Sequence, residues 1–87
     1  MTEKEANKIF IKKIKEFKNQ DITLDEFSSF SGRFFHEAGK KYPKSDLFQA
    51  TLMASELNFA VRAPAVFDNI PMYLEEVENF YKKYSKE

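Results

Sequence analysis

Apolar side chains recur along this chain at intervals of three and four residues, the spacing of one face of an α-helix. The pattern holds in four segments, and no segment alternates with the period of two that a β-strand requires. It predicts helices over residues 3–18, 24–40, 46–62 and 71–84, with a short turn around residues 64–68. Because the links are short, we expect an all-α, compact antiparallel four-helix bundle, with residues 1–87 as a single helical domain.

The starts of the first two helices carry the same signature. Thr2 is followed three residues later by Glu5, and Thr23 is followed by Glu26. In such a capping box the hydroxyl accepts a hydrogen bond from a free amide of the first turn, while the carboxylate accepts one from the threonine amide. These pairs place the helix starts, and Ser45 is expected to cap the third helix.

The third predicted helix is apolar nearly all round, so we expect it to be the central and most buried one. Pro64 ends it, because the residue before a proline is pushed out of the helical region. Pro71 stands near the start of the fourth helix, where a missing amide costs nothing. Gly32 costs the second helix about 1 kcal/mol relative to alanine. It indicates either close approach of a neighbouring helix or simple tolerance.

Composition shows what fills the interior. The 87 residues include ten Phe and four Tyr but no Cys, no Trp and one His. Each buried Phe contributes about 2 kcal/mol, so the rings let a short chain build a core without disulfides or metal. No apolar run reaches the length of a signal-peptide core or a membrane span, and we therefore expect a cytoplasmic protein.

Catalytic groups are scarce in the sequence. His36, beside Glu37, has the one side chain with a reference pKa near neutrality, but no spacing supplies it with a nucleophile or a second carboxylate. We expect a surface or half-buried histidine with a structural role. A single His without Cys leaves only scattered carboxylates for a metal, so we expect no metal, no cofactor and no enzyme.

The charges cancel overall but are unevenly spread. Fourteen acidic and fourteen basic residues leave no field that attracts nucleic acid or an anionic membrane, and the lysines of the first helix are expected to form a solvated face. Four acidic residues near the start of the last helix have no base among them: Asp68, Glu75, Glu76 and Glu78. They form either a solvated face that suits the helix dipole or a negative patch that steers a basic protein partner.

Arg62 is one of two arginines in the chain and ends the third predicted helix. Its planar fork donates two hydrogen bonds to a carboxylate at once. One hypothesis makes it a contact to the partner, beside the acidic patch. The other makes it an internal ion pair with Glu56 or Asp68.

The layout resembles the small all-helical immunity proteins of bacterial toxin systems, especially the colicin D type, which blocks a tRNA-cleaving toxin. In that family an amphipathic helix leads through a short polar break into an Ile-Thr/Ser-x-x-x-Phe start of helix two. The counterparts here are Ile14-Lys15-Glu16-Phe17 and Asp21-Ile22-Thr23-Leu24-Asp25-Glu26-Phe27. An apolar third helix and an acidic start to the last helix fit the same plan.

This resemblance implies a non-enzymatic inhibitor that plugs a toxin's active site with acidic side chains in place of the RNA backbone. The neutral overall charge departs from that expectation, since such inhibitors are usually acidic. Four-helix immunity proteins against pore-forming bacteriocins have a similar size and act near a membrane receptor. The broader immunity-type label covers both classes.

Two alternatives stay open. Residues 70–77 resemble the helix starts of helical-repeat domains in translation-initiation scaffold proteins, which form adaptor surfaces but need more hairpins than 87 residues supply. A general helical interaction module or homo-oligomer would instead use exposed rings as anchors, with Tyr73, Phe67 and Tyr42 as the candidates.

Overall fold

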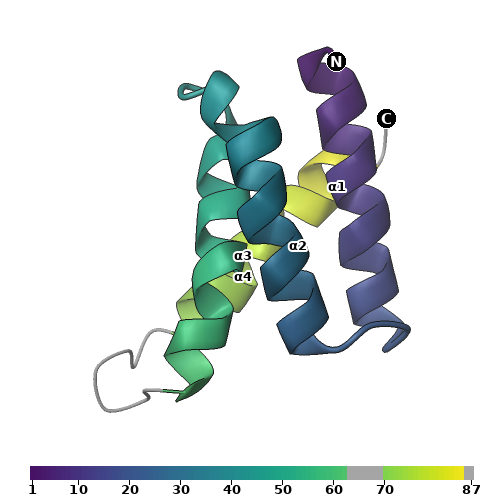
Figure 1. Cartoon of the computed structure of the whole chain (residues 1–87). Coiled ribbons are helices and arrows are strands. Elements are labelled where there is room, and N and C mark those ends of the chain that lie inside the picture. The colour runs from purple at the N-terminus through teal and green to yellow at the C-terminus, as the bar shows by residue number, and fades with distance from the viewer. Residues whose placement is uncertain (63–69, 86–87) are drawn as a thin grey trace.

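The computed structural model describes residues 1–62 and 70–85, and for residues 58–62 the backbone alone. Its helices are α1 (Glu3–Lys18), α2 (Leu24–Glu37), α3 (Asp46–Arg62) and α4 (Ile70–Tyr84), with a short 3₁₀ turn η1 (Gly39–Lys41) between α2 and α3 (Figure 1). The described residues contain no strand. The expected all-α four-helix bundle is confirmed, and the turn expected at residues 64–68 lies outside the described residues.

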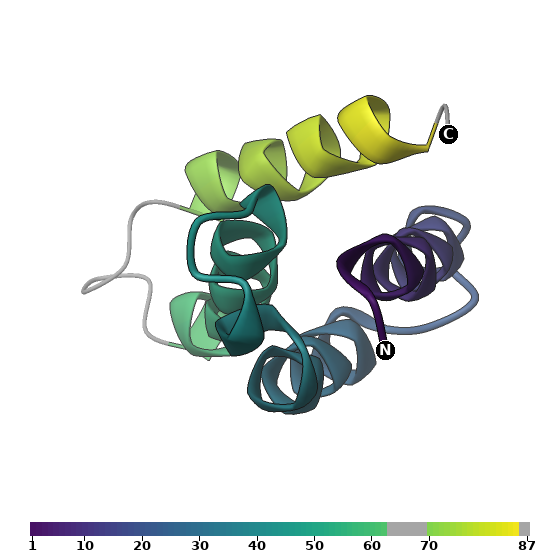
Figure 2. The same ribbon diagram turned by 90° about the horizontal axis from the view of Figure 1, so that it is seen from above.

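The fourth helix closes the bundle. In Figure 1, α1, α2 and α3 stand side by side, each running opposite to the one before it. Seen from above in Figure 2, these three helices are viewed nearly end-on, and α4 runs across them from α3 toward α1. It therefore contacts both the first helix and the third.

Both predicted capping boxes are present. The Thr2 hydroxyl oxygen accepts from the Glu5 amide at 3.1 Å, and the Thr23 hydroxyl oxygen accepts from the Glu26 amide at 3.1 Å. In return, Glu26 Oε1 accepts from the Thr23 amide at 3.0 Å. Hydrogen bonds from Thr2 lower the pKa of the Glu5 carboxyl. The starts of α1 and α2 are confirmed at the predicted residues.

The link between α2 and α3 differs from its prediction. The second helix ends at Glu37 and not at residue 40, because the chain turns at Ala38 (φ −135°) into η1. Ser45 does precede α3, but its buried hydroxyl makes no hydrogen bond to any described group, so the expected side-chain cap is wrong. Its carbonyl accepts from the Phe48 amide instead, at 3.2 Å.

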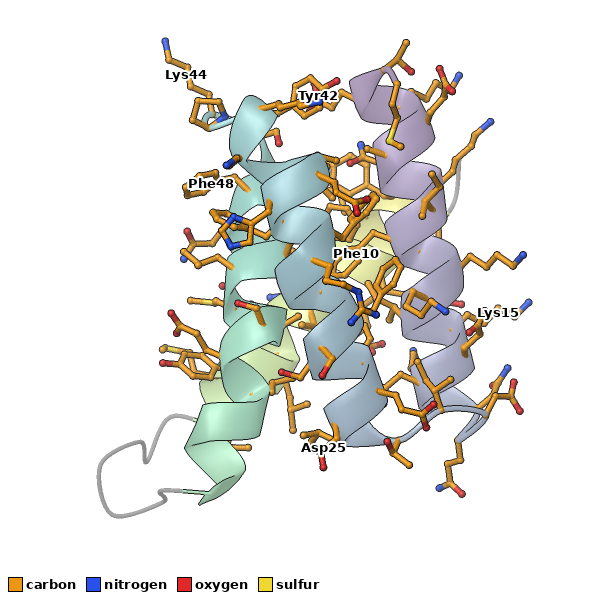
Figure 3. The ribbon with its side chains drawn as sticks, in the orientation of Figure 1. Phe10, Lys15, Asp25, Tyr42, Lys44 and Phe48 are labelled. Carbon is orange, nitrogen blue, oxygen red and sulfur yellow. The ribbon has the colours of Figure 1, made fainter. Side chains whose placement is uncertain are left out.

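Phe10 joins three helices at the centre of the core (Figure 3). This fully buried ring stacks on Phe27 and Phe34 of α2, with centroid distances of 5.9 and 6.2 Å, and meets the edge of Phe80 of α4 at 5.5 Å. Phe17 extends the stack, with its ring 4.7 Å from that of Phe27. One aromatic cluster therefore holds α1 against both neighbours.

The α2–α3 interface combines one ring pair, Phe35 and Phe48 at 5.1 Å, with small side chains that let the two backbones come close. Ser28 donates its hydroxyl to the Ser55 carbonyl at 3.0 Å. A Cβ placed on Gly32 would lie 3.6 Å from Ser55 Cβ, an ordinary contact, so Gly32 faces α3 without being required there. Gly39 differs, because a Cβ there would overlap the Thr51 hydroxyl. Between residues 47 and 57 of α3 only Gln49 is exposed, which confirms its central place.

The two glycines give opposite predictions for the same substitution. We expect Gly39→Ala to lower the free energy of unfolding by about 1–3 kcal/mol, as overpacking does in other cores. Gly32→Ala should raise it by up to about 1 kcal/mol, because alanine is the better helix former and meets no obstruction. Urea unfolding followed by circular dichroism measures both, and equal effects from the two variants would contradict this account of the interface.

Candidate functional site

The predicted acidic patch is divided by the geometry of α4. Successive residues of a helix are turned by about 100°, so Glu75 and Glu76 leave α4 on different sides, whereas Glu75 and Glu78, three residues apart, are neighbours on the helix surface. Glu78 faces α1, where its Oε1 accepts from Lys18 Nζ at 2.8 Å. Glu76 lines a pocket against α3, and Glu75 is exposed between them. The structure does not bring the three into one cluster.

Glu78 is already engaged within the protein. Its partner Lys18 also lies over the Tyr81 ring, 4.2 Å from the centroid, so the ammonium bridges α1 and α4 twice. Both side chains of the ion pair are more than one-third exposed, and solvent screening limits such a pair to about 1 kcal/mol at most. A partner that recruits Glu78 has to displace Lys18.

Glu75 and Glu76 have no ion-pair partner within the described part of the chain. The helix dipole does not explain their position either. The fourth helix begins at Ile70 and has no acidic residue in its first turn, and the favourable effect on carboxylates fades beyond that turn. The expected dipole benefit for these two residues is therefore wrong.

A pocket of about 160 Å³ lies between α3 and α4. It is lined by Asp46, Gln49, Ala50, Glu76, Asn79, Phe80 and Lys83. The sequence analysis did not find it, because Asp46 and Lys83 are far apart along the chain and only the crossing of α4 over α3 brings them together.

Asp46 is the centre of hydrogen bonding at the rim of this pocket. Its Oδ2 accepts from Lys83 Nζ at 2.6 Å and from the Tyr84 hydroxyl at 2.8 Å. These bonds, from Lys83 first, lower the pKa of the Asp46 carboxyl. Partial burial, followed by the bond to Asp46, raises the pKa of Tyr84, and the same carboxylate raises that of Lys83.

The other predicted contact residues have different outcomes. Arg62 is the last residue of α3, its side chain is not described, and Asp68 and Phe67 lie outside the described residues. Tyr73 is only 8% exposed, so the expectation that it is an exposed anchor is wrong. Burial first, and then the nearby Glu56 carboxylate, raise the pKa of its hydroxyl.

Tyr42 and His36 lie toward the surface without forming a chemical site. Tyr42 is half-buried and donates its hydroxyl to the Met1 carbonyl at 2.9 Å, which ties the link after η1 to the start of the chain (Figure 3). His36 is exposed, with its ring edge-on to Phe35 at 5.7 Å. The predicted surface position of His36 is confirmed.

The lysines of α1 fall into two groups. Lys13 and Lys18 form contacts within the protein. Lys13 pairs with Glu16 at 3.0 Å and lies over the Phe30 ring, and Lys18 forms the contacts with α4 given above. Four others are exposed and form no ion pair with the described residues: Lys4, Lys8, Lys12 and Lys15. Figure 3 shows Lys15 pointing away from the bundle. This outer stripe agrees with the expected solvated face.

The structure is that of a small all-α protein, and the exposed faces of α1 and α4 carry charged side chains that form no ion pair with the described residues. Among the described residues, no helix is both long and apolar enough to span a membrane. Comparisons with family models, curated proteins and solved structures found no match.

The lowered pKa of Asp46 predicts a pH-dependent contribution to stability. Its folded pKa lies below the ordinary value of 3.8, so the contribution is complete above that value and is lost as the pH falls through the folded pKa. Asp46→Asn should therefore be slightly less stable than the wild type near neutral pH, and this difference should vanish in acid. Thermal unfolding across the acidic range measures it.

Asp21→Asn provides the matched control, because Asp21 is exposed and forms no ion pair with the described residues. This variant removes the same charge without removing an ion pair, so its stability across the same pH range is the baseline against which Asp46→Asn is compared. If the Asp46 variant behaved in the same way, the hydrogen bonds from Lys83 and Tyr84 would not stabilise the folded state.

Proposed function

We propose that this protein is a non-enzymatic protein-binding domain that recognises a basic partner through the outer side of α4. The observation that supports it is a pair of adjacent carboxylates, Glu75 and Glu76, that form no ion pair with the described residues and share α4 with the exposed apolar side chains of Met72 and Leu74. Other exposed carboxylates, such as Asp21, are also unpaired, but they lack this apolar surface on their own helix. Two unpaired charges on a rigid helix attract a basic surface without first breaking an internal ion pair.

Apolar side chains beside these charges add contact area. Met72 is 45% exposed and Leu74 is 37% exposed. The helical spacing places these two side chains on either side of Glu75. A specific interface needs about 800 Å² from each partner and draws its affinity from apolar anchors more than from rim charges. The charges would then set orientation and association rate, and Met72 and Leu74 would supply buried area.

The resemblance to immunity proteins gives this binding a biological role. In that interpretation the partner is a bacterial toxin, and the carboxylates of α4 occupy the basic surface on which the toxin holds its substrate. Asp68 and Arg62 remain predicted members of the contact surface, together with Glu75, Glu76 and Glu78. The location expected for such an inhibitor is the cytoplasm.

A homo-oligomer is the second candidate, supported by the unpaired lysine stripe of α1. Lys4, Lys8, Lys12 and Lys15 of one copy complement the free carboxylates of α4 on another copy. Such a contact joins two different surfaces and leads to open chains or rings. Sedimentation at two protein concentrations and two salt concentrations tests it, since this contact weakens as salt rises.

Charge reversal on α4 tests the binding surface. We expect Glu75→Lys/Glu76→Lys to lose a basic partner that the wild type captures from a lysate of the source organism, because like charges then face each other across the interface. With the purified partner, the variant should associate at least about tenfold more slowly at low salt. If that partner is a toxin, co-expression of the wild-type domain should restore growth and the variant should not.

Asp21→Lys/Glu37→Lys is the matched control, because it makes the same change of net charge at two exposed carboxylates outside α4. Retention of the partner by this control, with loss in the α4 variant, supports the surface. Loss in both variants indicates a response to total charge only. Retention in both rejects the α4 surface, and recovery of the protein alone favours self-association.

A further inference from the structure

The pocket between α3 and α4 carries one unneutralised negative charge. Its three charged side chains are Asp46, Glu76 and Lys83. The Lys83 ammonium is held by Asp46 Oδ2, which leaves the Glu76 carboxylate without a counter-charge from the described residues. A half-buried carboxylate at the wall of a pocket favours a monovalent cation as the occupant.

The other walls favour an organic cation with several donors. Gln49 from α3 and Asn79 from α4 each supply an amide oxygen that can accept hydrogen bonds. The floor is apolar, formed by Ala50 and Phe80, which are 2% and 3% exposed. An ammonium has three donors around one point, whereas a guanidinium spreads five donors in a plane and leaves its faces free for apolar contact.

A metal ion fits the pocket less well. No group of three or more His, Cys, Asp or Glu side chains lies together among residues 1–62 and 70–85. The pocket volume of about 160 Å³ is also several times the ~30 Å³ share of one water molecule. A long side chain with an apolar stem uses this space, and a bare ion does not.

We propose that this pocket receives an arginine side chain of the protein partner, an inference that rests on the proposed function. The guanidinium forms a bidentate ion pair with Glu76, and the arginine stem lies on Ala50 and Phe80. The amides of Gln49 and Asn79 accept the remaining donors. Glu76 is then the specific contact, and Glu75, which lies outside the pocket, contributes only long-range attraction.

Lys83 opposes the entering arginine. Its ammonium lies at the pocket wall and repels a second cation, although Asp46 neutralises most of its charge. Removal of that ammonium should therefore strengthen arginine binding, whereas removal of the Glu76 charge should weaken it. If the two substitutions acted only by disturbing the fold, both the Lys83 and the Glu76 variant would bind arginine more weakly.

The experiment is an NMR titration of the full chain with the blocked tripeptide Gly-Arg-Gly, compared with Gly-citrulline-Gly, which has nearly the same shape without the charge. We expect the Arg peptide to shift the amide signals of Gln49, Asn79 and their neighbours, with the citrulline peptide binding at least about fivefold more weakly. Glu76→Gln should weaken the Arg peptide by about fivefold, and Lys83→Gln should strengthen it by about twofold.

Glu75→Gln is the matched control, since it removes the same charge one residue away and outside the pocket. Its affinity for the Arg peptide should stay within about twofold of the wild type. Equal losses in the Glu75 and Glu76 variants, equal binding of the two peptides, or no shifts at pocket residues would each overturn the arginine site.

These results separate the arginine site from the proposed function. A partner that is captured by the wild type and lost by Glu75→Lys/Glu76→Lys, together with no Arg-peptide binding, would retain the binding surface and reject the arginine site. If the Arg peptide binds but no basic partner is captured, the pocket does bind arginine, and its role in partner recognition is rejected.

Discussion

The structure depends on a single aromatic contact region around Phe10. This ring is the point at which α1 meets α2 and α4 together, and its stacked and edge-on neighbours are Phe27, Phe34 and Phe80. Loss of a buried Phe costs about 3–5 kcal/mol, which is a large part of the stability of a domain this small. The surface features of α1 and α4 are held in place through this cluster.

A different constraint holds α2 to α3. Two hydroxyls buried there bond to their own helices, with Ser31 donating to the Phe27 carbonyl at 2.8 Å and Thr51 donating to the Leu47 carbonyl at 2.7 Å, while Ser28 donates across to α3. These small polar side chains therefore fill the space between the helices, and each of their hydroxyl groups still donates a hydrogen bond. The interface of α2 with α1 is therefore built from large rings, whereas its interface with α3 combines small residues with one ring pair, Phe35 and Phe48.

The features that sequence reasoning predicted correctly are mainly local. The capping boxes at Thr2 and Thr23 and the periodic apolar faces depend on residues a few positions apart, so they can be read without knowledge of the packing. The early end of α2 at the Ala38 turn is not local in this sense, because the turn brings Gly39 against Thr51 of another helix. The sequence shows a glycine near the predicted end of this helix, but it does not show which side chain that glycine contacts.

The candidate site was harder to predict for the same reason. A row of acidic residues in the sequence does not show that Glu78 faces a lysine of α1 while Glu76 faces α3. The pocket forms only because α4 crosses α3 at a point that brings Asp46 and Lys83 together. No spacing in the sequence specifies where the two helices cross. Tyr73 was wrongly expected to be exposed, although its spacing from Val77 and Phe80 places all three on the buried face of α4.

The meeting of α1 with α4 has a consequence for how the chain folds. The helices of the α2–α3 hairpin are neighbours along the chain, whereas Lys18 and Glu78 are 60 positions apart. Loop-closure entropy grows with that separation, so the distant pair forms only after most of the chain is ordered. We expect the central hairpin to form first and the two outer helices to close on it together. The charged side chains of α1 and α4 then take their final positions in the last step of folding.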